Sequence, residues 1–576
     1  MSEEASKLPK DIAAAEGKVN VQINGTWHRF PRGTRIADAC RSVGVPIPCF
    51  CYHPKLAVAG SCRMCMVEQG MPPRLAPGQT PSYDENGYQR IQWMPRPIIS
   101  CANTVAENMG IRTDSPLASE ARRGVMEFLL TSHPLDCPIC DQAGECKLQE
   151  YSNDYGQVEG RFEEKKTKKG KNLSIGPRVN LDQERCVLCG RCVRFMRDIM
   201  HDEVLTMSQR GTFNAITVYP GRELDSNYSM NTVDLCPVGA LTSKDFRFKM
   251  RVWFLKETKT IDVDCGTGTN ITLWTREDKV YRITPRQNDA VNSCWMPDSH
   301  RLNYKYINAE TRIPQPVIRT DAEAPHRPST WEPASAAEAV KRIAPNQLAI
   351  IASGRMTNEE LYMVRHLAAQ IGTDMVDIVP RMGESDGMLI SADRNPNTNG
   401  ARLVLDIEPG SKLDAIREGV RSGSIKGILS LGEDLISPEA GFTTEDLDKL
   451  DYLFMTAHSA NETARHADLV LPGVTYAEKF GTMINVTGRI QRLNRAIQPI
   501  GYARDDWQIF RDITLLLGGN PALKDFNSAL DILTAMSTEY GALNGVSWGS
   551  IGDGGQPILE TGVTIPVVER EKNQGR

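Results

Sequence analysis

The stretch Arg185-Cys186-Val187-Leu188-Cys189-Gly190-Arg191-Cys192-Val193 places three cysteines at C-x2-C-x2-C spacing. One tight loop of this kind can direct three thiolates at one [4Fe–4S] cubane. A structural zinc site is the alternative. Zinc knuckles pair two separate C-x2-C hooks, and a third cysteine that continues the same run does not suit them. The stretch therefore predicts a [4Fe–4S] site that needs a fourth ligand from elsewhere in the chain.

The fourth ligand is predicted to be Cys236, which lies in Asp234-Leu235-Cys236-Pro237-Val238-Gly239-Ala240-Leu241. Cys-Pro is the last element of a bacterial ferredoxin ligand run. A two-cluster ferredoxin would carry a second C-x2-C-x2-C before this Cys-Pro, and the sequence has none. We therefore expect one cluster in a ferredoxin-like module spanning residues 151–250, held by Cys186, Cys189, Cys192 and Cys236.

A second cluster is predicted upstream, in a His-Cys module spanning residues 109–150. Residues 117–130 have a helical pattern in which Val125, Phe128 and Leu129 are available to pack inward. The segment after this helix has the spacing H-x3-C-x2-C-x5-C, formed by His133, Cys137, Cys140 and Cys146. Three thiolates and one imidazole can close a [4Fe–4S] site. A neutral ligand in place of a thiolate should raise its reduction potential, as in Rieske centres.

The N-terminal module, residues 17–108, begins as a β-grasp ferredoxin does. Alternating apolar residues from Val19 to Ile23, the turn Asn24-Gly25 and a returning strand to Phe30 predict a hairpin. Thr34 is expected to cap the helix that follows. Cys51, Cys62, Cys65 and Cys101 then suit a [2Fe–2S] cluster, with a zinc site as a competitor on spacing alone. Cys49 competes with Cys51, and Cys40 is expected to be a buried free cysteine on the helix.

The amino-acid composition limits the classes of protein to which this chain can belong. The 576 residues are 40% hydrophobic and 24% charged, as in a soluble protein of several domains. A net charge of −5 gives no electrostatic case for nucleic-acid binding. No apolar run is long enough to span a bilayer, and the acidic N-terminus does not have the pattern of a secretory signal. All 15 cysteines fall between Cys40 and Cys294, which places the metal chemistry in the N-terminal half.

The C-terminal half alternates strand and helix patterns, which favours a doubly wound parallel sheet over residues 316–515. The strands are expected at 348–352, 375–379, 403–407, 427–431 and 452–456. Thr357 and Glu360 predict a capping box at the start of the first helix. The charged loop at 152–180 is expected to be a solvated excursion. Residues 516–576, with the glycine-rich run 549–555, are expected to form a loosely structured tail.

Together these motifs resemble the large iron–sulfur subunit, the 75-kDa or G-type subunit, of respiratory complex I, over nearly the whole chain. The resemblance rests on Cys51-Tyr52-His53-Pro54, Gly60-Ser61-Cys62-Arg63-Met64-Cys65, the run from His133 to Cys140, and Cys236-Pro237-Val238-Gly239-Ala240. It implies that Cys51, not Cys49, is the first [2Fe–2S] ligand. It also extends to the molybdopterin-oxidoreductase fold through His466-Ala467-Asp468-Leu469-Val470-Leu471-Pro472 and Gly488-Arg489-Ile490-Gln491.

Some members of this family carry a further [4Fe–4S] cluster, which we do not expect here. In the corresponding segment, residues 251–315, only Cys265 remains of the first three ligand positions, and Pro297 stands where the last would be. Cys294 is nearby, but two cysteines cannot hold a cubane. No cysteine follows Cys294 to bind molybdenum, although a serine or aspartate ligand remains open. The resemblance implies a C-terminal α/β domain without cofactor.

The resemblance implies an electron-transfer subunit of NADH:quinone oxidoreductase with one [2Fe–2S] and two [4Fe–4S] clusters. The expected partners are a flavin- and NADH-binding subunit, a small [2Fe–2S] subunit and the quinone-module subunits. The expected location is the cytoplasmic side of a bacterial inner membrane, as a peripheral subunit. No nicotinamide or flavin motif is visible, so this chain alone should carry electrons without a substrate site. The alternatives are a molybdenum-dependent formate dehydrogenase, the diaphorase-side subunit of an NAD-linked hydrogenase, and a zinc-stabilised interaction protein.

Overall fold

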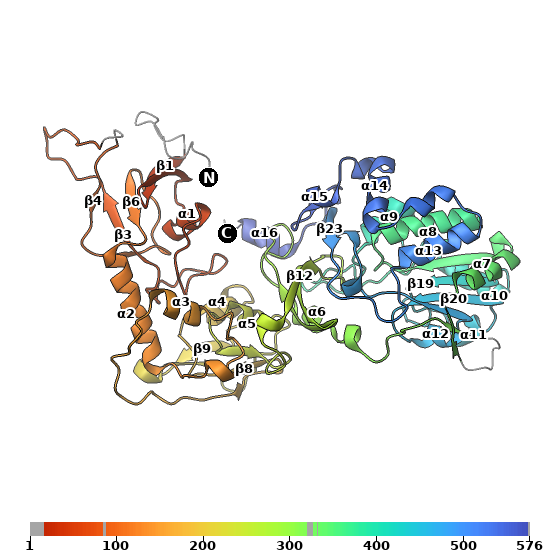
Figure 1. Ribbon diagram of the computed structural model, residues 1–576, viewed down its shortest axis with the longest axis horizontal. Coiled ribbons are helices and arrows are strands. Elements are labelled where there is room, and N and C mark those ends of the chain that lie inside the picture. Colours follow the sequence, from red (N-terminus) through yellow and green to blue (C-terminus); the bar gives the residue numbers. More distant parts are fainter. Residues whose placement is uncertain (1–16, 85–87, 320–325, 331, 574–576) are drawn as a thin grey trace. The chain divides into compact units, whose positions relative to one another are not determined.

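The chain forms two compact units, Met1–Trp253 and Phe254–Arg576, in a computed structural model (Figure 1). The structure describes residues 17–84, 88–319, 326–330 and 332–573. Unit 1 contains the cysteine motifs, and unit 2 contains the parallel sheet.

Unit 1 begins with the predicted β-grasp sheet, whose strands lie in the order β2-β1-β6-β3-β4, with β5 paired to β3. The β1–β2 hairpin turns at Asn24-Gly25, as expected, and β6 runs parallel to β1. The strand β6 lies beyond residue 108, where the sequence placed the end of this module. Thr34 does not cap the helix: its Oγ1 donates to the Pro31 carbonyl, and the N-cap residue is Arg35. The elements are β1 (Lys18–Ile23), β2 (Thr26–Pro31), α1 (Ile36–Ser42), β3 (Met66–Met71), β4 (Gln92–Trp93), β5 (Ile98–Ile99) and β6 (Met109–Arg112).

The rest of unit 1 consists of short helices and small sheets around an apolar cluster. Helix α2 forms where predicted, but Phe128 is 82% exposed, and Met126 is the large apolar side chain of this helix that is fully buried. Val125 and Leu129 pack against the cluster as expected. The elements are α2 (Pro116–Ser132), η2 (Cys137–Ile139), α3 (Lys147–Tyr155), β7 (Leu173–Ser174), β8 (Val179–Leu181), α4 (Arg191–Asp198), β9 (Leu205–Ser208), η3 (Gly211–Phe213), β10 (Ala215–Val218), α5 (Asn231–Leu235), β11 (Leu241–Ser243) and η4 (Val252–Phe254).

Much of the charged loop at 152–180 is exposed, as expected, but two of its lysines hold it to the rest of unit 1. Lys166 Nζ donates to the Leu130 and Thr131 carbonyls at 2.7 and 3.3 Å, where α2 ends. Lys171 Nζ lies 2.7 Å from Asp136 and 3.0 Å from Glu184. The loop therefore ties the segment after α2 to the residues directly before the ferredoxin-like motif.

Unit 2 is built on a seven-stranded sheet in the order β16-β15-β21-β20-β19-β17-β18. The five strands from β21 to β18 are parallel, which confirms the predicted doubly wound arrangement. Alternate side chains of these strands enter two separate cores. Helices α8 and α13 supply residues to one core and α10 and α11 to the other, so helices cover both faces (Figure 1). The sheet consists of β15 (Val317–Ile318), β16 (Arg327–Pro328), β17 (Leu348–Ala352), β18 (Val376–Ile378), β19 (Gly427–Leu431), β20 (Tyr452–Ala457) and β21 (Leu469–Pro472).

Helix α8 begins with the predicted capping box of Thr357 and Glu360 and ends at Gly372. Two further expectations for unit 2 are wrong. Residues 403–407 are not a strand: most of them belong to α9. Residues 516–576 are not a loose tail either, since Ile532, Leu533 and Met536 of α14 are buried in the same core as α8. The helices are α6 (Asp298–Arg301), α7 (Pro333–Arg342), α8 (Asn358–Ile371), α9 (Thr398–Leu405), α10 (Leu413–Ser422), α11 (Thr444–Leu447), α12 (Glu462–His466), α13 (Asp506–Leu516), α14 (Ala529–Glu539), α15 (Trp548–Ile551) and α16 (Pro566–Asn573), with 3-10 turns η5 (Lys305–Asn308), η6 (Pro345–Gln347), η7 (Tyr476–Glu478), η8 (Pro521–Asp525) and η9 (Gly541–Leu543).

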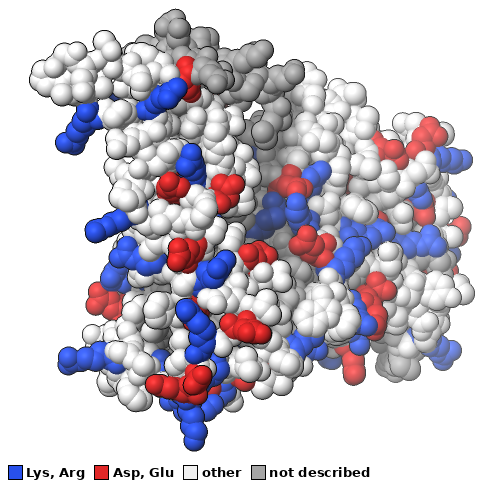
Figure 2. All heavy atoms as spheres, turned by 60° about the vertical axis from the view of Figure 1, so that its left-hand side comes forward, with Lys and Arg blue, Asp and Glu red and all other residues white. Residues whose placement is uncertain are grey.

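Two small antiparallel sheets complete unit 2. One consists of β12 (Lys256–Ile261), β13 (Asn270–Arg276) and β14 (Lys279–Pro285), and the other of β22 (Gly481–Ile484), β23 (Arg489–Leu493) and β24 (Gln556–Pro557). On the face drawn in Figure 2, lysine and arginine are interspersed with aspartate and glutamate, in keeping with the small net charge. Among the described residues, no helix is both long and apolar enough to cross a bilayer.

Candidate metal centres

The ferredoxin-like ligand loop is shaped by two residues with positive φ. Leu188 and Gly190 have φ of 52° and 67°, a region that favours glycine. The loop turns there and enters α4, so Cys186 and Cys189 lie on the loop while Cys192 lies in the first turn of the helix. Local backbone geometry therefore brings the three thiols of the run together, as the spacing predicts.

Cys236 joins these three thiols from the end of α5, where it is the C-cap residue. All four cysteines line one cavity, together with apolar residues such as Val187, Val238 and Leu241. Burial raises the pKa of Cys186 to about 12 and that of Cys236 to about 11. Four buried thiols in an apolar cavity have no favourable charged form until a metal or cluster supplies positive charge, so this donor set fits a [4Fe–4S] cluster.

The [2Fe–2S] candidates converge through the sheet. Strands β3 and β5 pair antiparallel with Met66 opposite Ile99, which brings Cys65, before β3, close to Cys101, after β5. Ser100 fixes this approach, since its backbone nitrogen and its Oγ both donate to the Cys65 carbonyl. The thiol of Cys101 also lies within hydrogen-bonding reach of Cys51 and Cys65.

Cys62 completes the set, since its sulfur accepts a hydrogen bond from the Cys51 backbone nitrogen at 3.5 Å. Hydrogen bonds from Cys101 and then Cys62 hold the pKa of Cys51 well below its ordinary value. Four cysteines linked in a chain of contacts, Cys62 to Cys51 to Cys101 to Cys65, fit a [2Fe–2S] cluster. Cys49 faces elsewhere, with its Sγ 3.7 Å from the Tyr52 carbonyl, and Cys40 is fully buried in the domain core.

The His-Cys candidates also line one cavity, formed by the end of α2, the turn η2 and the start of α3. His133, Cys137, Cys140 and Cys146 are all among its lining residues. His133 is the C-cap residue of α2 and Cys146 the N-cap residue of α3. Burial lowers the pKa of His133 to about 4, so its imidazole is neutral at pH 7, which is the form that binds metals. This donor set fits a [4Fe–4S] cluster with one neutral ligand.

The ferredoxin-like and His-Cys sites touch each other. A Cβ placed on Gly239 would lie 2.2 Å from Cys140 Sγ, so only glycine lets the Cys236 loop approach this closely. The Lys147 backbone nitrogen donates to the Pro237 carbonyl at 2.9 Å. Arg185, the residue before Cys186, donates from Nη2 to Asp136 at 3.0 Å and lines the His-Cys cavity. Neither Gly239 nor Arg185 is a predicted site residue, although both stand inside the ligand motifs.

The segment 251–315 does not offer the donors of a further cubane. Cys265 is fully buried, and its Sγ lies 3.7 Å from the Leu389 carbonyl. Nearby, Asp262, Asp264 and His300 have ligand atoms within 4.8 Å of one another. His300 Nδ1 lies 2.6 Å from Asp262 Oδ2. Burial opposes the charge on His300, but the neighbouring carboxylate of Asp262 outweighs burial and raises the pKa of His300, which favours its protonated form.

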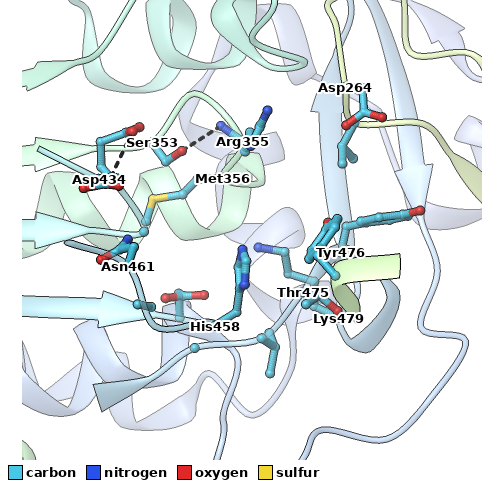
Figure 3. Close-up of a pocket in the computed structure, with 18 of the residues that line it drawn as sticks. Asp264, Ser353, Arg355, Met356, Asp434, His458, Asn461, Thr475, Tyr476 and Lys479 are labelled. Atoms are coloured by element: carbon cyan, nitrogen blue, oxygen red, sulfur yellow. Dashed lines mark hydrogen bonds between the residues drawn. The ribbon is translucent and has the colours of Figure 1, made fainter. Parts of the chain in front are cut away.

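Unit 2 has a cavity of about 210 Å³ where the parallel strands β17, β19 and β20 end (Figure 3). Ligands of open α/β sheets bind at such an edge. Two of its basic side chains are paired with acids: Lys479 with Glu360 at 2.9 Å, and Arg381 with Glu433. The volume is below the ~300–1,000 Å³ of ordinary small-molecule sites. A pterin cofactor therefore does not fit the cavity as it stands.

Five family models match the chain in succession. They are the 2Fe-2S iron-sulfur cluster binding domain (16–116), the NADH-ubiquinone oxidoreductase-G iron-sulfur binding region (122–161), the NADH-quinone oxidoreductase subunit 3 ferredoxin-like domain (176–242), the NDSU1/NuoG-like 4Fe-4S domain (255–305) and molybdopterin oxidoreductase (380–514). The fourth model covers the segment in which Cys265 and Cys294 are the only cysteines.

Curated relatives match most of the chain. The G-type subunit of NADH-quinone oxidoreductase from Rickettsia bellii is 37% identical, over 91% of this chain and 89% of its own length. The mitochondrial NADH-ubiquinone oxidoreductase 78 kDa subunit of Neurospora crassa is 31% identical, over 89% of this chain and 82% of its own. Among solved structures, an NAD+-reducing [NiFe]-hydrogenase is 27% identical over 41% of this chain and 91% of that one, but the TM-score of 0.33 is too low to bear on the fold.

Proposed function

The chain belongs to the family of large iron–sulfur (G-type) subunits of NADH-quinone oxidoreductase, and on that premise we propose which residues carry its electrons and in what order. It is an electron-transfer subunit of complex I with one [2Fe–2S] cluster and [4Fe–4S] clusters. The comparisons do not favour the formate dehydrogenase or hydrogenase alternatives. The proposed ligand sets are Cys51, Cys62, Cys65 and Cys101 for [2Fe–2S]; His133, Cys137, Cys140 and Cys146 for one [4Fe–4S]; and Cys186, Cys189, Cys192 and Cys236 for the other.

One observation carries this proposal: a single apolar cluster in unit 1 includes members of all three ligand sets. Cys51, Cys146 and Cys189 are buried in it together with Met64 and Met126. Electron transfer between clusters needs them close together in a medium that excludes water. A shared apolar core supplies both conditions, whereas separate structural zinc sites would not require it.

We propose that electrons pass through the ferredoxin-like cluster between the [2Fe–2S] cluster and the His-Cys cluster. Its loop contacts the His-Cys site at Gly239, and Arg194 of α4 bonds to the Cys51 carbonyl of the [2Fe–2S] loop. In sequence the ferredoxin-like motif is last, so its central place follows from the fold and not from chain order. When bound, the clusters supply one-electron chemistry, and these residues hold the cluster sites, bury them and set their charge.

The neighbours of this chain follow from the proposed order. We propose that the [2Fe–2S] end receives electrons from a flavin- and NADH-binding subunit and its small [2Fe–2S] partner. The His-Cys end then faces the quinone-module subunits. We further propose that the chain is a peripheral subunit on the cytoplasmic side of a bacterial inner membrane. Unit 2 acts in this scheme as a scaffold without cofactor, which the small volume of its cavity supports.

The order is tested in the intact complex with Cys186→Ala, which removes a ligand of the middle site. Freeze-quenched EPR should then show the [2Fe–2S] cluster reduced by NADH while the His-Cys cluster stays oxidised. The control is Cys49→Ala. Cys49 lies two residues before Cys51 but outside the ligand sets, so this variant should behave as wild type. Reduction of the His-Cys cluster at the wild-type rate in Cys186→Ala would contradict the proposed order.

A further inference from the structure

A buried arginine bridges the [2Fe–2S] loop and the ferredoxin-like loop. Arg194, on α4, is only 7% exposed. Its Nη2 donates to the Cys51 carbonyl at 2.5 Å and to the Cys189 carbonyl at 3.3 Å. The same guanidinium also donates to the carbonyls of Ala57 and Gly190. Each of the two ligand loops therefore receives two hydrogen bonds from one side chain.

The charge of Arg194 has no carboxylate partner. All four of its acceptors are backbone carbonyls, and among the described residues no carboxylate lies within ion-pair distance of it. The nearest acid on the helix, Asp198, pairs with Arg197 at 2.7 Å. A buried cation without a carboxylate partner is costly, and the guanidinium of Arg194 lies against the backbone of one proposed ligand of each of the two clusters.

A second arginine one turn earlier repeats the arrangement. Arg191 Nη2 donates to the Tyr52 carbonyl at 2.6 Å, and Nη1 donates to the Leu235 carbonyl at 3.3 Å. Tyr52 follows Cys51, and Leu235 precedes Cys236. Helices α4 and α5 pack against each other, so Arg191 joins the [2Fe–2S] loop to the other end of the ferredoxin-like ligand set. Because Arg191 donates to the backbone on both sides of the contact between the two loops, it holds the loops in position in addition to placing a positive charge there.

We propose that Arg194 is a positioning residue that holds the [2Fe–2S] loop against the ferredoxin-like loop and raises the reduction potentials of both clusters together. The inference rests on the proposed ligand sets. Reduction adds one negative charge to a cluster, and a nearby buried cation stabilises the reduced form. Because the guanidinium contacts a ligand residue of each cluster, one charge acts on both couples and raises both potentials together.

The test compares three variants of the intact complex by EPR-monitored redox titration. Arg194→Gln should lower each of the two midpoint potentials by at least ~59 mV, which is a tenfold change in the equilibrium constant for one-electron reduction. Arg194→Lys keeps the charge and should stay closer to wild type at both clusters. Arg197→Gln removes an exposed charge from the same helix and should leave both potentials unchanged.

Two clusters with intact EPR signals and unshifted potentials in Arg194→Gln would overturn the inference, as would a shift confined to one cluster. An equal shift in Arg197→Gln would also overturn it. If Arg194→Gln does not assemble the clusters, the outcome for Arg194→Lys tests the inference. Two EPR signals near the wild-type potentials in Arg194→Lys would support the inference. Loss of the signals, or a large shift of the potentials, would refute it. Wild-type complex that lacks both signals would instead refute the proposed ligand sets.

Discussion

Replacing Gly239 by alanine tests the contact between the ferredoxin-like loop and the His-Cys site. The added methyl would lie 2.2 Å from Cys140 Sγ and 3.1 Å from Gln142 Cβ. Ordinary contacts between such atoms are about 3.5–4.0 Å, so the sulfur must retreat by roughly 1.3 Å. Metal–ligand distances tolerate only about 0.2 Å. The displacement therefore exceeds what a cluster ligand can absorb.

The expected result of Gly239→Ala is selective loss of one cluster. The Cys140 side chain can rotate away without disturbing the backbone, so the chain should fold, but the sulfur would no longer point into the His-Cys cavity. Iron should fall from about ten to about six atoms per chain, the loss of one [4Fe–4S] cluster. Iron analysis and EPR of the purified chain measure this directly, and the other two signals should remain.

The matched control for this variant is Gly124→Ala. Gly124 lies within α2, and an added Cβ there has nothing within 4 Å. Alanine in a helix interior is favoured over glycine by about 1 kcal/mol, so this variant should keep all its iron and unfold slightly later. Full iron content and an unchanged His-Cys signal in Gly239→Ala would refute the assignment of Cys140 as a ligand.

Three further outcomes are expected. His133→Cys should keep a [4Fe–4S] EPR signal at lower potential, because an anionic ligand replaces a neutral one, and an unchanged titration would show that His133 is not a ligand. Burial lowers the pKa of His458 to about 3, below its ordinary 6.5. The unfolded state therefore takes up the proton first, and stability falls as the pH drops from 6.5 toward 3. Denaturation at pH 7 and pH 5 should show a loss on the order of 2 kcal/mol that His458→Gln lacks, and equal losses in the two proteins would contradict this. Phe454→Ala, at a fully buried strand position, should cost about 3–5 kcal/mol by calorimetry, whereas Phe480→Ala, at a side chain 43% exposed, should cost little.

The grouping of the candidate ligands could be predicted because cluster ligation imposes short, regular spacings. Cys186, Cys189 and Cys192 are brought together by one loop, and the structure needs no distant contact to do so. Cys101 is different, since it reaches Cys65 only through the pairing of β3 with β5. Chain spacing includes Cys101 in the set but does not show this register; the family pattern was needed only to choose Cys51 over Cys49. The contact at Gly239 and the bridge formed by Arg194 are tertiary features that no local pattern reveals.

The errors in the predicted fold have physical causes. A short apolar run such as 403–407 suits a buried strand or a helix turn equally well, and here tertiary packing selects the helix. The glycine-rich run suggests a loose C-terminal tail, but the cap that starts α14, Ser528 with Asp531, is the stronger local signal. Phe128 is large and apolar, which predicts a buried side chain. Met126 takes the buried place on α2 instead.

Metal and sulfide analysis of the purified chain tests the central claim most directly. We predict about ten iron and ten acid-labile sulfide atoms per chain, the sum of one [2Fe–2S] and two [4Fe–4S] clusters, without molybdenum. Zinc in place of iron would contradict the electron-transfer role. Stoichiometric molybdenum with a pterin would contradict the interpretation of unit 2 as a scaffold. About fourteen iron atoms per chain would show that the further [4Fe–4S] cluster, which we do not expect, is present.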